Sequence, residues 1–164
     1  DIDVPPTLVS FAVDVAKIQD VITPELKKAG NKLVWLRAPK NQYDLPDYAG
    51  IMDQYEKLHK DMQDGKVVSA YALDRHGIAA AVAKMAFGNG MGVKIEHNLD
   101  PRDFFAPGFG DIILEVPDGK VGELSITYTV IGEVTADGNF SYGNTVITVD
   151  EAENAWKGTL EKSI

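Results

Sequence analysis

The sequence predicts an α+β fold in which a mixed β-sheet of about six or seven strands packs with three main helices. Hydrophobic residues make up 45% of the 164 residues, enough for one sizeable core, and we expect residues 1–164 to form a single domain. Strand-like segments alternate with helical patterns along the chain. Late in the chain, Asp137-Gly138 joins two alternating segments, as in a β-hairpin, which argues against a purely parallel, doubly wound sheet.

Seven segments have the alternation or the apolar character of strands. They are residues 7–16, 32–38, 66–73, 93–97, 111–116, 126–135 and 140–149. The third segment, "KVVSAYAL", is a nearly continuous apolar run, which is typical of a strand in the middle of a sheet. The last two segments are expected to pair with each other around Asp137-Gly138.

Two helices are predicted in the first half of the chain. Residues 23–30 form a short one, with Thr23 as its cap and Gly30 at its end. Residues 48–64 carry apolar side chains at helical spacing between Asp47, the expected cap, and Gly65, the expected stop. Their Met and Tyr stripe is compatible with a cofactor site, but a helix that faces the core explains it more simply.

Two further helices are predicted in the second half. Residues 77–87 form an alanine-rich helix, which we expect to pack closely against the sheet because nearly every face is apolar or small. The glycines of "GNGMG" follow this helix and precede a strand, the reverse of the order in a phosphate loop, and are interpreted as a helix stop. The final helix begins at Asp150, with Glu153 completing a capping box. Its expected apolar face is Ala152, Ala155, Trp156 and Leu160.

Charge and composition exclude several classes of function. A net charge of −9 leaves no basic cluster for phosphate contacts, so no nucleic-acid partner is predicted. The absence of Cys excludes a thiol nucleophile and a Cys-based zinc site and fits a cytoplasmic protein. The three histidines, His59, His76 and His97, lack the spacing of a shared metal site, and no metal site is predicted. No apolar run approaches the roughly 20 residues that span a bilayer, so no membrane partner is predicted.

One short motif has the order of a ligand site. Asp74, Arg75, His76 and Gly77, here called the DRHG turn, lie between a predicted strand and the N-terminus of a predicted helix. The free N–H groups and positive end of a helix attract anions, Arg75 and His76 add charge, and Asp74 suits a cation such as Mg²⁺. The plainer interpretation is that Asp74 caps the helix and Gly77 permits close packing. No Ser-His-Asp set can be assembled, and no catalytic residue is assigned.

Several segments carry a resemblance to a known family. In chain order they are "TLVSFAVDVAKIQDVITPELKKAGNKLVWL", "VVSAYALDRHGIAAAVAKMAFGNGMGVKIE", "PGFGDIILEV" and "TVIGEV". Together they resemble the C-terminal domain of the aminoimidazole ribonucleotide synthetase superfamily. The closing "AWKGTLEKSI" resembles the Trp-bearing helix that ends the synthetase core in the phosphoribosylformylglycinamidine synthase family. The resemblance implies the fold of that C-terminal domain, and we expect the chain to be excised from a much larger multidomain one.

The resemblance also implies a function. The family is an ATP-dependent ligase of de novo purine biosynthesis that converts formylglycinamide ribonucleotide and glutamine to formylglycinamidine ribonucleotide. It implies ATP and Mg as cofactors of the parent enzyme and other domains of the parent chain as partners. We expect the domain alone to be inactive, to bind neither cofactor tightly and to self-associate weakly through an exposed packing surface. The alternative is another superfamily enzyme, of the thiamine-phosphate kinase or selenophosphate synthetase type.

The chain departs from the family pattern at the DRHG turn. The family's metal-binding Asp falls on Ala72, its nucleotide-contacting Ser on Asp74, and its paired Gly on His76-Gly77. The Gly-rich segment after the second strand is replaced by "PKNQYDLPD". Asp74, Arg75, His76 and Gly77 are therefore the candidate nucleotide contacts of a degenerate auxiliary site, and the local role of the domain is expected to be structural.

Overall fold

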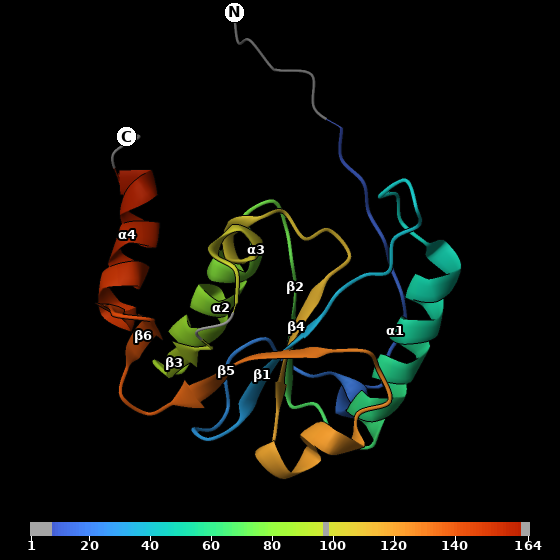
Figure 1. Ribbon diagram of the computed structural model, residues 1–164, viewed down its shortest axis with the longest axis horizontal. Helices are drawn as coiled ribbons and strands as arrows, with labels where there is room; N and C mark the ends of the chain where they lie inside the picture. Colours follow the sequence, from blue (N-terminus) through green and yellow to red (C-terminus); the bar gives the residue numbers. More distant parts are fainter. Residues whose placement is uncertain (1–7, 97–98, 162–164) are drawn as a thin grey trace, which may run out of the picture.

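A seven-stranded mixed sheet with helices on both faces forms the centre of the molecule (Figure 1). The computed structural model describes residues 8–96 and 99–161. The strands are β1 Lys32–Leu36, β2 Ser69–Ala72, β3 Gly92–Ile95, β4 Ile112–Val116, β5 Thr129–Thr135, β6 Asn139–Tyr142 and β7 Thr145–Thr148, in the order β2-β4-β1-β5-β3-β6-β7. β3 and β6 are parallel, and the other neighbouring pairs are antiparallel. The predicted α+β class is confirmed.

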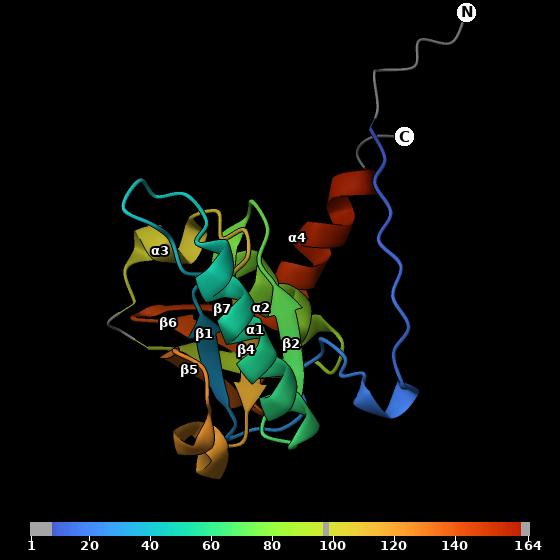
Figure 2. The same cartoon turned by 90° about the vertical axis from the view of Figure 1, so that its right-hand side faces the viewer.

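The helices divide between the two faces of the sheet. α1 (Tyr48–Gln63) lies on one side, and α2 (Gly77–Phe87), α3 (Pro101–Phe105) and α4 (Val149–Glu161) lie on the other (Figures 1 and 2). Two 3-10 helices, η1 (Ile18–Asp20) and η2 (Asp118–Glu123), complete the elements. Within residues 8–96 and 99–161, no helix is long and apolar enough to cross a membrane.

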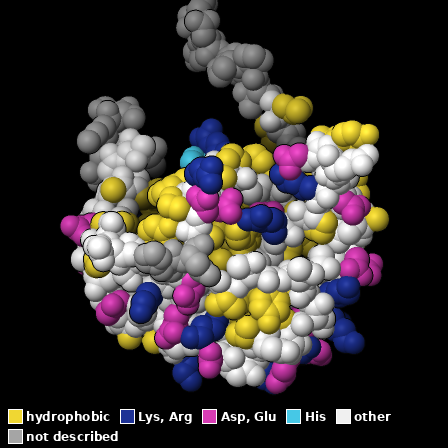
Figure 3. All heavy atoms as spheres, in the orientation of Figure 1, with side chains coloured by type: hydrophobic (Ala, Val, Ile, Leu, Met, Phe, Trp, Pro, Cys, Tyr) yellow, Lys and Arg dark blue, Asp and Glu magenta, His cyan; other side chains and the backbone are white. Residues whose placement is uncertain are grey.

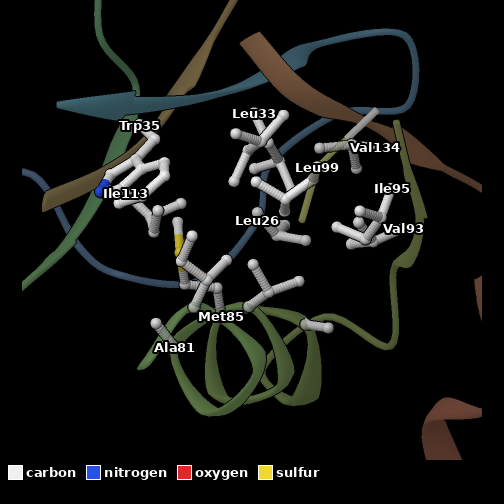
Figure 4. Packing of buried hydrophobic residues seen from close by; sticks show 14 of the residues in the cluster. Leu26, Leu33, Trp35, Ala81, Met85, Val93, Ile95, Leu99, Ile113 and Val134 are labelled. Carbon is white, nitrogen blue, oxygen red and sulfur yellow. The ribbon is translucent and has the colours of Figure 1, made fainter. Parts of the chain in front are cut away.

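Strand β1 shows how the sequence builds a core on each face. Successive side chains of a strand point to opposite faces, and four apolar residues follow one another here. Leu33 and Trp35 join the core under α2, whereas Val34 and Leu36 join the core under α1. Figure 4 shows Leu33 and Trp35 directed toward Met85 of α2. Because both faces are covered, β1 is apolar without alternation.

Helix α2 has the predicted bounds and packs as expected. Its residues Ile78, Ala81, Val82, Met85 and Ala86 are all buried against the sheet. The small alanine side chains let the helix axis approach the strands, so Met85 fills the space beneath β1 and β4 (Figure 4).

The predicted hairpin around Asp137-Gly138 is wrong. β3 lies between β5 and β6, antiparallel to the first and parallel to the second. The Asp137 side chain closes the turn by accepting from the Thr135 hydroxyl (2.6 Å) and the Asn139 N–H (3.1 Å). The start of β3 fits into the mouth of this turn because Gly92 has no Cβ to collide with Asp137 and Thr135. The real hairpin joins β6 to β7 through Gly143-Asn144, with Gly143 at φ +58.

The N-terminal predictions also need correction. Residues 8–16 form no strand, because no other strand of the described chain pairs with them; Thr7 lies outside the described residues. Residues 23–30 form no helix, because tertiary partners take their backbone donors. Leu26 N–H donates to the Met85 carbonyl at 2.8 Å, and the N–H groups of Lys27 and Lys28 donate to the Glu115 carboxylate.

Strand β2 lies at an edge of the sheet and not in the middle. Its segment is apolar because cores cover both faces: Ala70 contacts the core under α1, and Tyr71 contacts the core under α2. The Ser69 hydroxyl donates to the Pro24 carbonyl at 2.8 Å, which places the segment around Pro24, before β1, beside this edge. A continuous apolar run therefore indicates that both faces of the strand are covered. It does not indicate that the strand lies in the middle of the sheet.

Two helix details differ from the sequence prediction. In α1, Asp47 caps Gly50 N–H and Leu58 is buried as expected, but Tyr48 and Met52 at the N-terminal end of the stripe are exposed. At α4, the capping box forms two residues earlier than predicted. Thr148 and Glu151 make the reciprocal bonds in place of Asp150 and Glu153. Trp156 contacts Phe87 of α2 and stays half exposed; the side chain of Leu160 lies outside the description.

Candidate functional site

The DRHG turn lies where the sequence places it, between the end of β2 and the start of α2. Gly77 has φ +70, and a Cβ there would lie 2.5 Å from the Ala106 carbonyl oxygen. The loop after α3 therefore packs directly on the turn. The Asp74 carbonyl accepts from Gly108 N–H at 3.1 Å, which ties the same loop to the turn a second time. Gly77 permits this close packing, as the plainer interpretation expects.

The Asp74 carboxylate is already held by groups of its own chain. It accepts from the backbone N–H of His76 at 2.7 Å, and His76 Nδ1 lies 3.1 Å from the same oxygen. Lys84 Nζ lies 3.7 Å from the other oxygen. The His76 N–H bond is the main cause of a lowered pKa of Asp74, and the His76 ring and Lys84 add to it. The carboxylate is therefore ionised at neutral pH and has three local partners.

Asp74 does not cap α2 in the sense expected from the sequence. The N-cap residue is His76, which has no side-chain capping bond. Asp74 instead accepts from the N–H of the cap residue itself and closes the turn one step before the helix. Arg75 and His76 are exposed, and Arg75 Nε donates to His76 Nε2 at 3.2 Å. Ala72, also exposed, has no side-chain oxygen to offer a metal.

A cavity of about 510 Å³, lined by both apolar and charged side chains, lies next to the turn, where β1 and β2 end against the loop that follows α3. Its lining includes Leu73, immediately before the turn, but none of the four DRHG residues. Its aromatic and ionisable side chains are Trp35, Arg37, Lys40, Asp44, Asp103, Phe109 and Asp111. The sequence pattern does not mark these residues as a site. The only signal was the replacement of the Gly-rich segment by "PKNQYDLPD", which contributes Lys40 and Asp44 to the cavity.

Asp111 is the buried acid of this cavity. It accepts from Trp35 Nε1 at 2.9 Å and from Ala38 N–H at 2.8 Å. Burial raises the pKa of Asp111, and these two bonds oppose the increase. Arg37 stacks over the Trp35 ring at 3.9 Å and pairs with Asp103 at 3.1 Å. The donors of Trp35 and Ala38 and the charges of Arg37 and Asp103 therefore all have partners, and these contacts fix the end of β1.

The described residues offer no metal centre of protein ligands. Among residues 8–96 and 99–161, no three His, Asp or Glu side chains cluster as a metal site would require. His97 lies outside the described residues. The prediction that this chain has no metal site stays a prediction.

No family model matches the chain. The subunit PurL of phosphoribosylformylglycinamidine synthase from Lactobacillus acidophilus is 29% identical over 120 residues, covering 68% of this chain and 16% of that protein. PurL from a Nocardioides species is 31% identical over 120 residues, covering 66% and 15%. The chain resembles PurL. It spans about one sixth of the length of these relatives.

Solved structures show the same fold. PurL from Thermotoga maritima superposes with a TM-score of 0.68 at 12% identity, covering 84% of this chain and 28% of that one. Escherichia coli HypE superposes with a TM-score of 0.57 at 15% identity, covering 76% and 50%. At these identities the likeness concerns the fold, and the predicted likeness to the aminoimidazole ribonucleotide synthetase C-terminal domain is confirmed. T. maritima PurL has been solved with formylglycinamide ribonucleotide, ATP, ADP and AMPPCP.

Proposed function

We propose that this chain is a domain of a PurL-type ligase, which uses ATP and glutamine to convert formylglycinamide ribonucleotide to formylglycinamidine ribonucleotide. The observation that carries the proposal is the sequence similarity to PurL over about 120 residues, on a fold that superposes on PurL. No observation favours the alternative of a thiamine-phosphate kinase or a selenophosphate synthetase. The parent enzyme acts in the cytoplasm, with ATP and Mg²⁺ as cofactors and its other domains as partners.

Residues 1–164 act as one packing domain of that enzyme, beside a degenerate nucleotide site at Asp74–Gly77. The contacts of the DRHG turn support this role. Asp74 is engaged by His76 and Lys84, and an ionised carboxylate repels phosphate unless a cation lies between them. Ala72 supplies no metal ligand to hold such a cation. The isolated chain is therefore inactive and binds ADP with Mg²⁺ more weakly than about 1 mM.

A chimera tests the function. The segment of L. acidophilus PurL that matches this chain is replaced by residues 1–164, and the gene is placed in a bacterium that lacks its own PurL. Growth without added purine is expected, because the domain supplies the packing that the synthetase core needs. A matched chimera with Gly77→Val, in which a side chain would collide with the Ala106 carbonyl, should not support growth. A folded, soluble chimera that never restores growth contradicts the proposal.

Calorimetric titration of the purified chain tests the local role. Little heat is expected with ADP and Mg²⁺, and Asp74→Ala should leave the titration unchanged. Submillimolar binding that disappears in Asp74→Ala would show that the DRHG turn is a working nucleotide site and that the structural role is wrong.

A further inference from the structure

The segment that precedes β1 carries a large apolar surface that the described chain does not cover. Residues 8–21, here called the arm, include seven large apolar side chains that are 58–96% exposed. They are Leu8, Val9, Phe11, Val13, Val15, Ile18 and Val21. The arm runs away from the sheet into solvent (Figures 1 and 2). Its base is fixed, because Leu26 is fully buried and its N–H bonds to α2.

The pattern of the arm is that of a strand with one buried face. In an extended chain, Val9, Phe11, Val13 and Val15 point to one side. The opposite side carries Leu8, Ser10, Ala12, Asp14 and Ala16, and all of these except Leu8 are small or polar. A strand of this kind is stable only when its backbone pairs with another strand and its apolar face packs on a core. The arm has the sequence of a paired strand, but no strand among the described residues pairs with it.

At the other end of the described sheet, strand β7 forms an open edge. β7 is the last strand of the sheet and pairs with β6 on one side; no strand of residues 8–96 or 99–161 pairs with its other side. All four of its residues are exposed, including Val146 and Ile147. An open edge of this kind presents unpaired N–H and C=O groups to any extended chain. It carries no charged residue that would resist pairing.

An apolar groove lies beside this edge. Its volume is about 380 Å³, and α2, α3, β6, β7 and α4 surround it. The residues that matter here are Val82, Ala83, Phe104, Tyr142 and Ile147. Figure 3 shows hydrophobic side chains gathered on this face between α4 and α3. Ile147 lines the groove, and Val146, next to it in β7, does not line it. A strand added to β7 would therefore place its apolar face over the groove.

We propose that the arm of one copy of this chain pairs with the β7 edge of a second copy and lays Val9, Phe11, Val13 and Val15 over its groove. The second arm does the same in return, which gives a two-fold dimer by exchange of arms. The inference does not depend on the proposed function.

The area available matches that of a stable dimer. Burying a large aliphatic or aromatic side chain removes on the order of 100 Å² from water, so the four side chains on the apolar face of one arm supply roughly 400 Å². Each copy also buries its own edge and groove under the partner's arm, which adds roughly the same area and gives about 800 Å² for each copy. Standard interfaces bury about 800 Å² on each partner. The net charge of −9 opposes association, but Asp14 is the only charge in residues 8–16. The dimer should therefore tighten as added salt screens the repulsion between the two bodies.

Sedimentation of the full 164-residue chain over a wide range of concentration tests the proposal. A concentration-dependent dimer is expected. Val13→Asp, on the apolar face of the arm, should weaken it at least about tenfold, whereas Ala12→Asp, the same charge on the opposite face, should weaken it less than about threefold. Val13 is 93% exposed in the single chain, so its substitution cannot unfold the domain. Ile147→Asp and Val146→Asp form the matching pair on β7.

Mixing identifies the contact as arm to edge. Val13→Asp has a damaged arm and an intact edge, and Ile147→Asp has the reverse. Each variant alone should be largely monomeric, while the mixture should form a heterodimer through its one intact arm-to-edge contact. A chain that is monomeric at all concentrations, or a dimer that Val13→Asp leaves unchanged, overturns the proposal. A monomer whose arm is protected from proteolysis would place the arm on its own groove and also overturn it.

Discussion

Glu115 of β4 organises the segment that enters the sheet, and its removal should destabilise the whole domain. Its side chain is fully buried. It accepts from the backbone N–H groups of Lys27 (2.7 Å) and Lys28 (3.0 Å) and from Asn31 Nδ2 (2.7 Å). These bonds take the place of the helix that the sequence predicts at residues 23–30. They hold Leu26 in the core, where its N–H reaches Met85.

Glu115→Ala leaves three donors without their acceptor. A buried donor that loses its partner costs about 1–3 kcal/mol, and a partly buried one recovers some of this from water. Only the Asn31 donor is fully buried, so we expect a loss of about 3–5 kcal/mol. Domains of this size are stable by about 5–15 kcal/mol, so the loss is a large fraction of the total. The melting temperature should fall by about 6–20 °C.

Urea denaturation followed by circular dichroism measures the loss, with Glu133→Ala of β5 as the control. Glu133 also accepts from a lysine, Lys32 at 2.6 Å, but its side chain is 43% exposed. An exposed ion pair of this kind contributes about 0–1 kcal/mol. If Glu115→Ala and Glu133→Ala cost the same, the buried carboxylate does not organise the segment, and the reasoning is refuted.

Two further predictions follow from the same structure. Gly77→Ala should cost about 2–4 kcal/mol in thermal denaturation, because a Cβ would meet the Ala106 carbonyl at 2.5 Å, whereas Gly65→Ala, at φ +68 with open space, should cost only about 1 kcal/mol; equal losses would contradict the collision. Burial favours the protonated form of Asp61, but bonds from Lys66 and Ser125 outweigh it and lower the pKa of Asp61 below its usual 3.8. The stabilisation by ionised Asp61 should therefore be complete above about pH 4 and be lost as the pH falls through the lowered folded-state pKa. The unfolding free energies of wild type and Asp61→Asn should then converge in acid. A difference between the two that stays constant from neutral to acid pH would contradict this.

Local patterns predict much of this fold. α2 begins and ends where its alanine-rich pattern does, and β1 falls within residues 32–38. The hairpin prediction fails because an Asp-Gly turn specifies a reversal of the chain and does not specify that the flanking strands pair. β3 enters the turn at Gly92, 45 residues before Asp137 in the sequence, and pairs with both β5 and β6, which therefore do not pair with each other. No local signal reports that insertion.

The candidate site is predicted in place but not in detail. The order of strand, turn and helix locates Asp74–Gly77 correctly. The role of Asp74 depends on the conformation of His76, which occupies the N-cap and turns its N–H back to the carboxylate. The neighbouring cavity depends on Trp35 and Asp111, which meet across 76 residues of sequence. Contacts of this range arise from the sheet order β4-β1, and the sequence pattern does not fix that order.

The failed strand prediction for residues 7–16 carries information of its own. Alternation of apolar and small or polar residues reports that one face of a segment is buried, and it does not report in which molecule the burial occurs. Within the described chain, Val13 and Val15 are more than 90% exposed, although residues 9–16 alternate between large apolar side chains and small or polar ones. A regular pattern on an exposed segment is costly in solubility, because it offers an aggregation site. The pattern therefore indicates a contact that covers the arm, and β7 with its groove is a surface of this same chain with an open edge and an apolar face to meet it.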